Sequence, residues 1–131
     1  MTEKIEDVIK TSSILIHPSR YIYLKTTDKN LANHFFVSQD KDETSIVTEE
    51  KNLNSVKYSD SVGWFKLIEI KLSVPFLQGF LSRVIKPIAD AGFNTLIVST
   101  FSKDYILIKE NNIKEVTIIL KQMGFKEVIE Q

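Results

Sequence analysis

The order of hydrophobic periods in the second half of this chain of 131 residues limits its possible folds more than any other feature. An apolar residue at every second position indicates a strand, and apolar residues spaced three and four positions apart indicate a helix. Four segments follow one of these periods, and two further runs, 94–100 and 104–110, are rich in the β-branched and aromatic residues that favour strands. In order they are a strand over 64–72, a helix over 76–92, strands over 94–100 and 104–110, a helix over 111–124 and a strand over 125–130. The predicted order is therefore βαββαβ.

Residues that cap or bend secondary structure stand at the ends of these segments. Gly92 and Gly124 follow the two helices, where a left-handed cap is favoured, and the asparagines at 111–112 precede the second helix as a predicted cap. Pro87 lacks an amide donor, so we expect it to bend or divide the first helix. The order βαββαβ is that of the ferredoxin-like sandwich, an α+β fold with four antiparallel strands and two helices on one face.

The first half of the chain is less regular. Four short strand-like runs lie within residues 13–50, and each is too short to build a domain alone. The polar segment 56–63, VKYSDSVG, is typical of a boundary or a crossover. We therefore predict two units, an abbreviated sandwich over residues 1–60 and a complete one over residues 61–131.

Composition argues against several classes of partner. The 17 basic and 17 acidic residues balance, so no net field attracts nucleic acid or an anionic membrane. The chain has no cysteine, which excludes disulfides and thiolate chemistry, and its apolar runs fall far short of the about 18 residues that suggest a membrane span. The N-terminal residues lack the basic flank and apolar block of a signal peptide. We expect a cytoplasmic protein with no nucleic-acid or membrane partner.

The hairpin over 94–110 carries polar side chains where its two apolar runs meet. Ser99 and Thr100 end the first run, and Asp104 begins the second. In one interpretation these side chains bond to the backbone of the turn, as Ser, Thr and Asp commonly do. In the other they form the rim of a site, where Asp104 pairs with a ligand ammonium group and the hydroxyls donate or accept hydrogen bonds. The pattern alone leaves both interpretations open.

The segment before the first helix, SVPFLQG over 73–79, is a second candidate part of a site. A helix N-terminus offers unpaired amides and the positive end of the helix dipole to a carboxylate. Gly79 would let a ligand or a neighbouring backbone approach closely, although packing of the helix against the sheet explains it as well. Phe76, Leu77 and Gln78 stand beside it and are candidate ligand contacts.

Several segments together resemble the small ACT-domain proteins that carry two ACT-like units in one chain, a group that the animal cytosolic arginine sensors also resemble. The resemblance extends over roughly residues 14–124. It rests on the segments TSIVTEE, GWFKLIEI and LQGFLSRVIKPIADAGFNTLIVSTFSKDYILIKE. Its most specific part is the block from Ser99 to Leu107, where serine, threonine, an aromatic residue and Asp104 follow one another as they do in the family.

The resemblance implies a regulatory protein without a cofactor, a homodimer that binds a free amino acid between ACT-like units. It adds Ser45 and Ile46, which match a strand motif of the family, to the candidate residues. The complete predicted set is Ser99, Thr100, Asp104, Phe76, Leu77, Gln78, Gly79, Ser45 and Ile46. A ligand-free assembly module, pairing through its hairpin and edge strands, is the alternative.

Enzymes with this fold need residues that the sequence does not place. An acylphosphatase-like site requires an arginine before the first helix to hold a phosphate, whereas Arg83 stands inside the helix. No glycine-rich phosphate loop, serine-histidine-aspartate order or catalytic carboxylate pair stands out. His17 and His34 are far apart in sequence and have no evident third metal ligand. We therefore expect neither catalysis nor a metal site.

Overall fold

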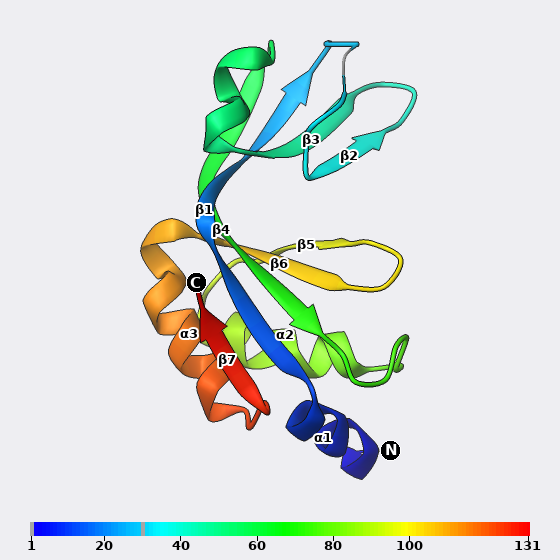
Figure 1. Ribbon diagram of the computed structural model, residues 1–131, viewed down its shortest axis with the longest axis vertical. Coiled ribbons are helices and arrows are strands. Elements are labelled where there is room, and N and C mark those ends of the chain that lie inside the picture. Colours follow the sequence, from blue (N-terminus) through cyan, green and yellow to red (C-terminus); the bar gives the residue numbers. More distant parts are fainter. Residues whose placement is uncertain (1, 30) are drawn as a thin grey trace. The chain divides into compact units, whose positions relative to one another are not determined.

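The computed structural model in Figure 1 describes residues 2–29 and 31–131. Its elements in chain order are α1 (Thr2–Thr11), β1 (Ser13–Thr26), β2 (Phe36–Gln39), β3 (Thr44–Glu49), the 3-10 helix η1 (Glu50–Ser55), β4 (Asp60–Lys71), α2 (Phe80–Asp90), β5 (Leu96–Ser99), β6 (Asp104–Lys109), the 3-10 helix η2 (Glu110–Asn112), α3 (Ile113–Gln122) and β7 (Glu127–Glu130).

The chain forms two compact units. Unit 1 comprises Met1–Pro18 and Lys66–Gln131, and unit 2 comprises Ser19–Phe65. This differs from the contiguous division into residues 1–60 and 61–131 that the sequence suggested. The physical reason is strand pairing, because the first residues of β1 run parallel to the last strand, with Ser13 opposite Glu127 and Ile16 opposite Glu130.

Unit 1 has the predicted α+β, ferredoxin-like architecture. The series β4-α2-β5-β6-α3-β7 reproduces the order βαββαβ, and β5 and β6 form an antiparallel hairpin. One strand is added, because β1 pairs with both β4 and β7 and gives the order β7-β1-β4-β6-β5. Figure 1 shows α2 next to α3, which it contacts, and β7 next to β1.

The core of unit 1 lies between the helices and one face of these strands. Alternate strand residues such as Ile14, Ile68 and Ile106 point into it and have no exposed surface. Val84 of α2 and Leu120 of α3 meet them there, also without exposure. The helical spacing in α2 and α3 is therefore a consequence of burying one face of each helix, whereas β4 and β6 bury both faces over 67–70 and 105–108.

The ends of α2 and α3 follow backbone preferences. Gly92 and Gly124 have φ of +91° and +97°, the left-handed conformation that ends many helices and suits glycine. Helix α2 begins at Phe80 rather than 76, because Phe76 and Gly79 have φ of +57° and +82°. It continues through Pro87 to Asp90, so the proline does not divide it.

Helix α1 was not predicted, although its apolar residues have helical spacing. Val8 and Ile9 are buried in the core of unit 1, and Ile5 packs against it. Glu6 also accepts a hydrogen bond of 2.7 Å from Nε of Arg83 in α2. No helix within the described residues is both long and apolar enough to cross a membrane.

Unit 2 is built on a second, smaller set of strands in the order β2-β3-β1-β4. Strand β3 pairs antiparallel with both β1 and β2. Two of the four predicted strand-like runs, at 13–18 and 20–26, form the single strand β1. This strand changes partner near Pro18, because its pairing with β7 ends at Ile16 and its pairing with β3 begins at Tyr21. Ile22, Leu24 and Ile46 form the core of unit 2 with Val56.

Candidate functional site

The turn between β5 and β6 brings the three predicted polar residues together. Ser99 and Asp104 are opposite each other in the hairpin, and the Ser99 hydroxyl donates a hydrogen bond of 2.7 Å to Oδ1 of Asp104. The turn is closed by the Thr100 amide, which donates to the Lys103 carbonyl at 3.0 Å. Asp104 is half-buried and Ser99 is exposed. The carboxylate is therefore oriented by a neighbouring side chain and still reaches the surface.

A hollow of about 190 Å3 lies between this turn and the connection from β4 to α2. The connection contributes three apolar residues, Leu72, Pro75 and Phe76, and the turn contributes residues 99–104. Polar groups thus come from one side of the hollow and apolar side chains mostly from the other. We call this space, with these lining residues, the hairpin hollow.

Two phenylalanines stand at the hairpin hollow and are unusually exposed. Phe76 is 76% exposed and Phe101 is 86% exposed. Their rings meet edge to face, with centroids 5.8 Å apart and an interplanar angle of 79°. This arrangement is favourable for aromatic rings, but it leaves most of both ring surfaces in water.

The other predicted residues of the β4 to α2 connection have different roles. Leu77 packs against the core of unit 1, and Gln78 is exposed. Gly79 precedes the first residue of α2, and its left-handed backbone explains the glycine without any ligand. A Cβ atom there would lie 3.4 Å from the Cδ1 atom of Ile5, an ordinary contact. Phe76 is the residue of this group that lines the hairpin hollow.

Ser45 and Ile46 belong to unit 2 and not to the hairpin hollow. Ile46 has no exposed surface, because it packs against Ile22 and Leu24 in the core of that unit. Its position in unit 2 therefore offers no surface to a ligand. Ser45 lines a separate hollow, and its predicted contact with a ligand stays a prediction.

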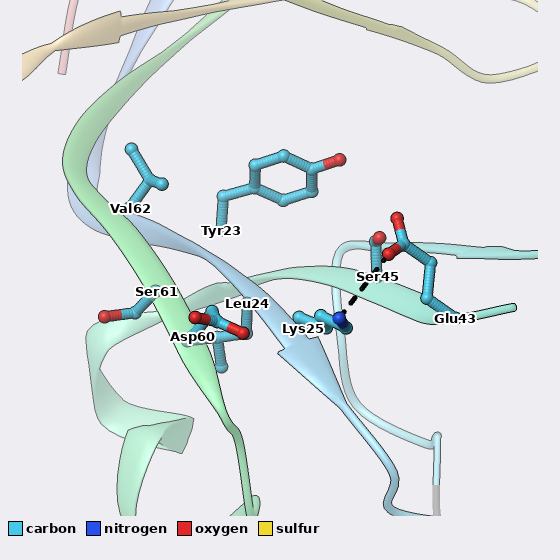
Figure 2. A pocket seen from close by; sticks show the side chains of 8 residues that line it. All are labelled: Tyr23, Leu24, Lys25, Glu43, Ser45, Asp60, Ser61 and Val62. Atoms are coloured by element: carbon cyan, nitrogen blue, oxygen red, sulfur yellow. Dashed lines mark ion pairs between the residues drawn. The ribbon is translucent and has the colours of Figure 1, made fainter.

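Figure 2 shows this separate hollow of unit 2, which has a volume of about 140 Å3. Its residues come from β1, the start of β3 and β4, and the charged ones are Lys25, Glu43 and Asp60. Nζ of Lys25 lies 3.8 Å from Oε1 of Glu43, so the two charges are paired across the opening. All three charged side chains are exposed, and an ion pair in this setting is weak.

A buried charge on unit 1 was missed in the sequence. Glu69 of β4 is only 3% exposed. Its Oε1 atom accepts a hydrogen bond of 3.0 Å from Nε2 of His17, and its Oε2 atom lies 3.3 Å from Nζ of Lys103. Burial by itself raises the pKa of Glu69, but the hydrogen bond from His17 and the positive charges of His17 and Lys103 outweigh it and hold the pKa below its ordinary value. Burial, followed by the charge of Glu69, raises the pKa of the neighbouring Tyr105.

Lys103 connects this buried charge to the hairpin hollow. Its backbone closes the turn, its side chain lines the hollow, and its ammonium group pairs with Glu69. The ammonium group also stays partly in solvent, with 43% of the side chain exposed. The ion pair between Lys103 and Glu69 therefore connects the turn to β4. A second anion, such as a ligand carboxylate, can still approach the exposed part of the Lys103 ammonium group.

The two histidines have structural partners. His17 pairs with Glu69, and Nδ1 of His34 lies 2.9 Å from the hydroxyl oxygen of Thr48 in unit 2. In the part of the chain that the structure describes, no three His, Asp or Glu side chains gather into a group that could hold a metal ion.

The comparisons with known proteins agree on the class of fold. The model of the ACT domain family matches residues 63–122, which include the hairpin and helices α2 and α3. No curated protein matches the chain. The fold of unit 1 is thus an α+β sandwich of the kind found in ACT domains.

Three solved structures resemble the chain over nearly its whole length. A Vibrio cholerae protein of unknown function, described as a possible transport protein, has a TM-score of 0.79 at 13% identity, covering 94% of this chain and 98% of its own. An Agrobacterium tumefaciens protein has a TM-score of 0.69 at 23% identity, covering 92% and 94%. A putative C-terminal regulatory domain of aspartate kinase from Porphyromonas gingivalis has a TM-score of 0.58 at 15% identity, covering 88% and 99%. At these identities the likeness concerns the fold.

Proposed function

We propose that this protein is a non-catalytic regulatory module that binds a free amino acid at the hairpin hollow. The observation that carries the proposal is the Asp104 carboxylate, which Ser99 orients at 2.7 Å beside a hollow with an apolar wall. The match of residues 63–122 to the ACT domain model supports a regulatory role for small-ligand binding. The predicted position of the ligand between ACT-like units, the kinship with two-unit ACT proteins and arginine sensors, and the cytoplasmic location all remain predictions from the sequence.

The size of the hairpin hollow fits a ligand of this kind. Its volume of about 190 Å3 greatly exceeds the about 10–15 Å3 that one water needs, and it is below the about 300–1,000 Å3 typical of sites for drug-sized ligands. A free amino acid lies between these limits. The hollow opens at the surface, so such a ligand can enter without unfolding any element.

The charges around the hairpin hollow fit a zwitterion. A bound ammonium group needs an anion, because leaving a charge unpaired away from water is costly. Asp104 offers that anion, and Lys103 offers a partly solvated cation to the ligand carboxylate at the same turn. Both ends of an amino acid thus find an opposite charge within one hairpin.

The test is a thermal-shift screen of the protein against the twenty amino acids at millimolar concentration. We expect one amino acid, or a chemically related group, to raise Tm, by mass action on the native state. Asp104→Asn should abolish the shift, since the variant keeps the size of the side chain and removes its charge. The matched control is Asp90→Asn, which removes an exposed carboxylate paired with Lys86 on α2. This variant should keep the Tm shift caused by the amino acid. A flat response to all amino acids, or an undiminished shift in Asp104→Asn, would contradict the proposal.

Exposed apolar side chains favour the second candidate, a ligand-free assembly module. Three large apolar side chains are exposed: those of Phe76, of Phe101 and of Ile97, which lies on the edge strand β5. Exposed apolar surface often mediates protein association. Assembly predicts a Tm that rises with protein concentration and ignores amino acids. Sedimentation measurements over a hundredfold concentration range separate this candidate from ligand binding and also test the predicted homodimer.

A further inference from the structure

We infer that the hairpin hollow selects amino acids with a large apolar or aromatic side chain, and that Phe76 and Phe101 determine this specificity. The inference rests on the proposed function and adds to it the class of ligand. Three features of the hollow carry it: the exposure of the two rings, the backbone of Phe76, and the balance of charges at the turn.

The exposure of the two rings shows that the chain itself does not use them for its core. With 76% and 86% of their surfaces exposed, Phe76 and Phe101 contribute little to folding by burial. Their edge-to-face contact nevertheless holds them together at the hairpin hollow. An apolar ligand group placed against both rings would bury surface that is otherwise in water.

The backbone of Phe76 makes a large side chain costly at this position. Its φ of +57° lies in the left-handed region, where Cβ crowds the backbone and glycine or asparagine is favoured. Gly79, three positions later, has the same type of conformation without that cost. Residues held in such conformations cluster at ligand sites. A strained, exposed phenylalanine is therefore explained by what its ring contacts outside the chain.

The charges of the hairpin hollow leave none for a ligand side chain. Asp104 is matched by the ligand ammonium group. Glu69 is paired with both Lys103 and Lys71, so that Lys103 can also face the ligand carboxylate. An acidic ligand side chain would add a second negative charge beside Asp104, and a basic one would add a second positive charge beside Lys103. The remaining lining, Leu72, Pro75 and the two rings, is apolar. A neutral, large apolar side chain satisfies all of these groups.

Isothermal titration with phenylalanine, leucine, glutamate, lysine and glycine tests the inference. We expect phenylalanine or leucine to bind at least tenfold more tightly than glutamate, lysine and glycine. Phe101→Ala should weaken binding of the preferred amino acid by about tenfold, which corresponds to about 1.4 kcal/mol, and change glycine binding by less than about twofold. Ile118→Ala removes an exposed apolar side chain from α3, outside the hollow, and should change neither value.

Phe76→Gly provides a second variant in which loss of the fold is not a concern. Glycine suits the left-handed backbone and little buried surface is lost, so Tm should stay the same or rise by up to about 3 °C. Binding of the preferred amino acid should nevertheless fall by about tenfold. A variant that is at least as stable but binds weakly would show that the phenylalanine is kept for the ligand.

The outcomes separate this inference from the proposed function. If glutamate or lysine binds most tightly and Asp104→Asn abolishes that binding, the proposed function stands and the apolar specificity is overturned. If Phe101→Ala and Phe76→Gly leave binding unchanged and instead abolish self-association, the rings serve assembly and the inference is again overturned. If no amino acid binds the unaltered protein, both the function and its specificity fail.

Discussion

Unit 1 holds two carboxylates whose surroundings differ sharply, Glu69 on β4 and Asp104 at the start of β6. Glu69 is almost fully buried, and both of its oxygens face cations at 3.0 and 3.3 Å, His17 when protonated and Lys103. Asp104 is half-buried, and among the described residues its carboxylate accepts a hydrogen bond from a neutral hydroxyl, that of Ser99. Glu69 is thus paired with cations inside the fold, although its Oε2 atom accepts no hydrogen bond from the described residues, and Asp104 keeps capacity for a partner from outside.

The difference shows how the same chemical group serves stability in one place and binding in another. A buried charge must be paired, since removing its partners leaves it without water or counterion. A charge at the surface is paired weakly and can exchange partners at little cost. Lys103 precedes Asp104 in the turn and pairs with Glu69, so Glu69 helps to fix the turn that presents Asp104. The predictions below test whether stability and binding are divided in this way.

The largest effect on stability is expected from Glu69→Ala. The variant leaves His17 and Lys103 without their carboxylate, and we expect the free energy of unfolding to fall by about 2 kcal/mol, less than for a fully buried pair because both partners are partly exposed. Urea denaturation measures it. Glu130→Ala is the matched control, since its carboxylate pairs with Lys121 in solvent and should contribute about 0.5 kcal/mol or less. If Glu69→Ala and Glu130→Ala lower the free energy of unfolding equally, the buried carboxylate of Glu69 stabilises the fold no more than a carboxylate at the surface.

A change of pH is expected to have a smaller effect on the free energy of unfolding than Glu69→Ala. The pKa of Glu69 is lower in the folded protein than the ordinary value of 4.5, so the folded state favours the ionised form. The resulting stabilisation is fully present above about pH 4.5 and is lost as the pH falls through the lower native pKa. The difference in free energy of unfolding between the unaltered protein and Glu69→Gln should therefore shrink on acidification. A difference that is constant from neutral pH down to pH 3 would mean that the charge of Glu69 is not what stabilises the fold.

Most of the architecture of unit 1 followed from local periods, whereas its non-local features did not. Alternation in β4, the β-branched and aromatic runs of β5 and β6, helical spacing in α2 and α3, and glycines at the helix ends are properties of neighbouring residues, and the structure confirms that part of the fold. The insertion of β1 beside β7 depends on pairing between residues more than a hundred positions apart. No local pattern specifies it.

The candidate site shows the same limit. Ser99, Thr100 and Asp104 are close in sequence, and a hairpin necessarily brings them together. The burial of Glu69 was not predicted, because it depends on His17 of β1 and Lys103 of the hairpin turn, which are both far from Glu69 in sequence. The pairing of Phe76 with Phe101 likewise joins two loops, so their separate positions in the sequence gave no sign of it.

The smallest effect on stability is expected from Asp104→Asn, and it is the sharpest test of the comparison. The asparagine side chain keeps an oxygen that can accept the hydrogen bond from Ser99, and the site is at the surface, so the free energy of unfolding should change by no more than about 0.5 kcal/mol. The same variant should lose amino-acid binding. We expect the opposite pattern for Glu69→Gln, in which the free energy of unfolding falls more than the affinity for the amino acid. Urea denaturation and titration on one preparation give both values. If Asp104→Asn destabilises the fold as strongly as Glu69→Ala, then Asp104 belongs to the structure of the turn, and the polar residues of the hairpin are there to build it rather than to bind.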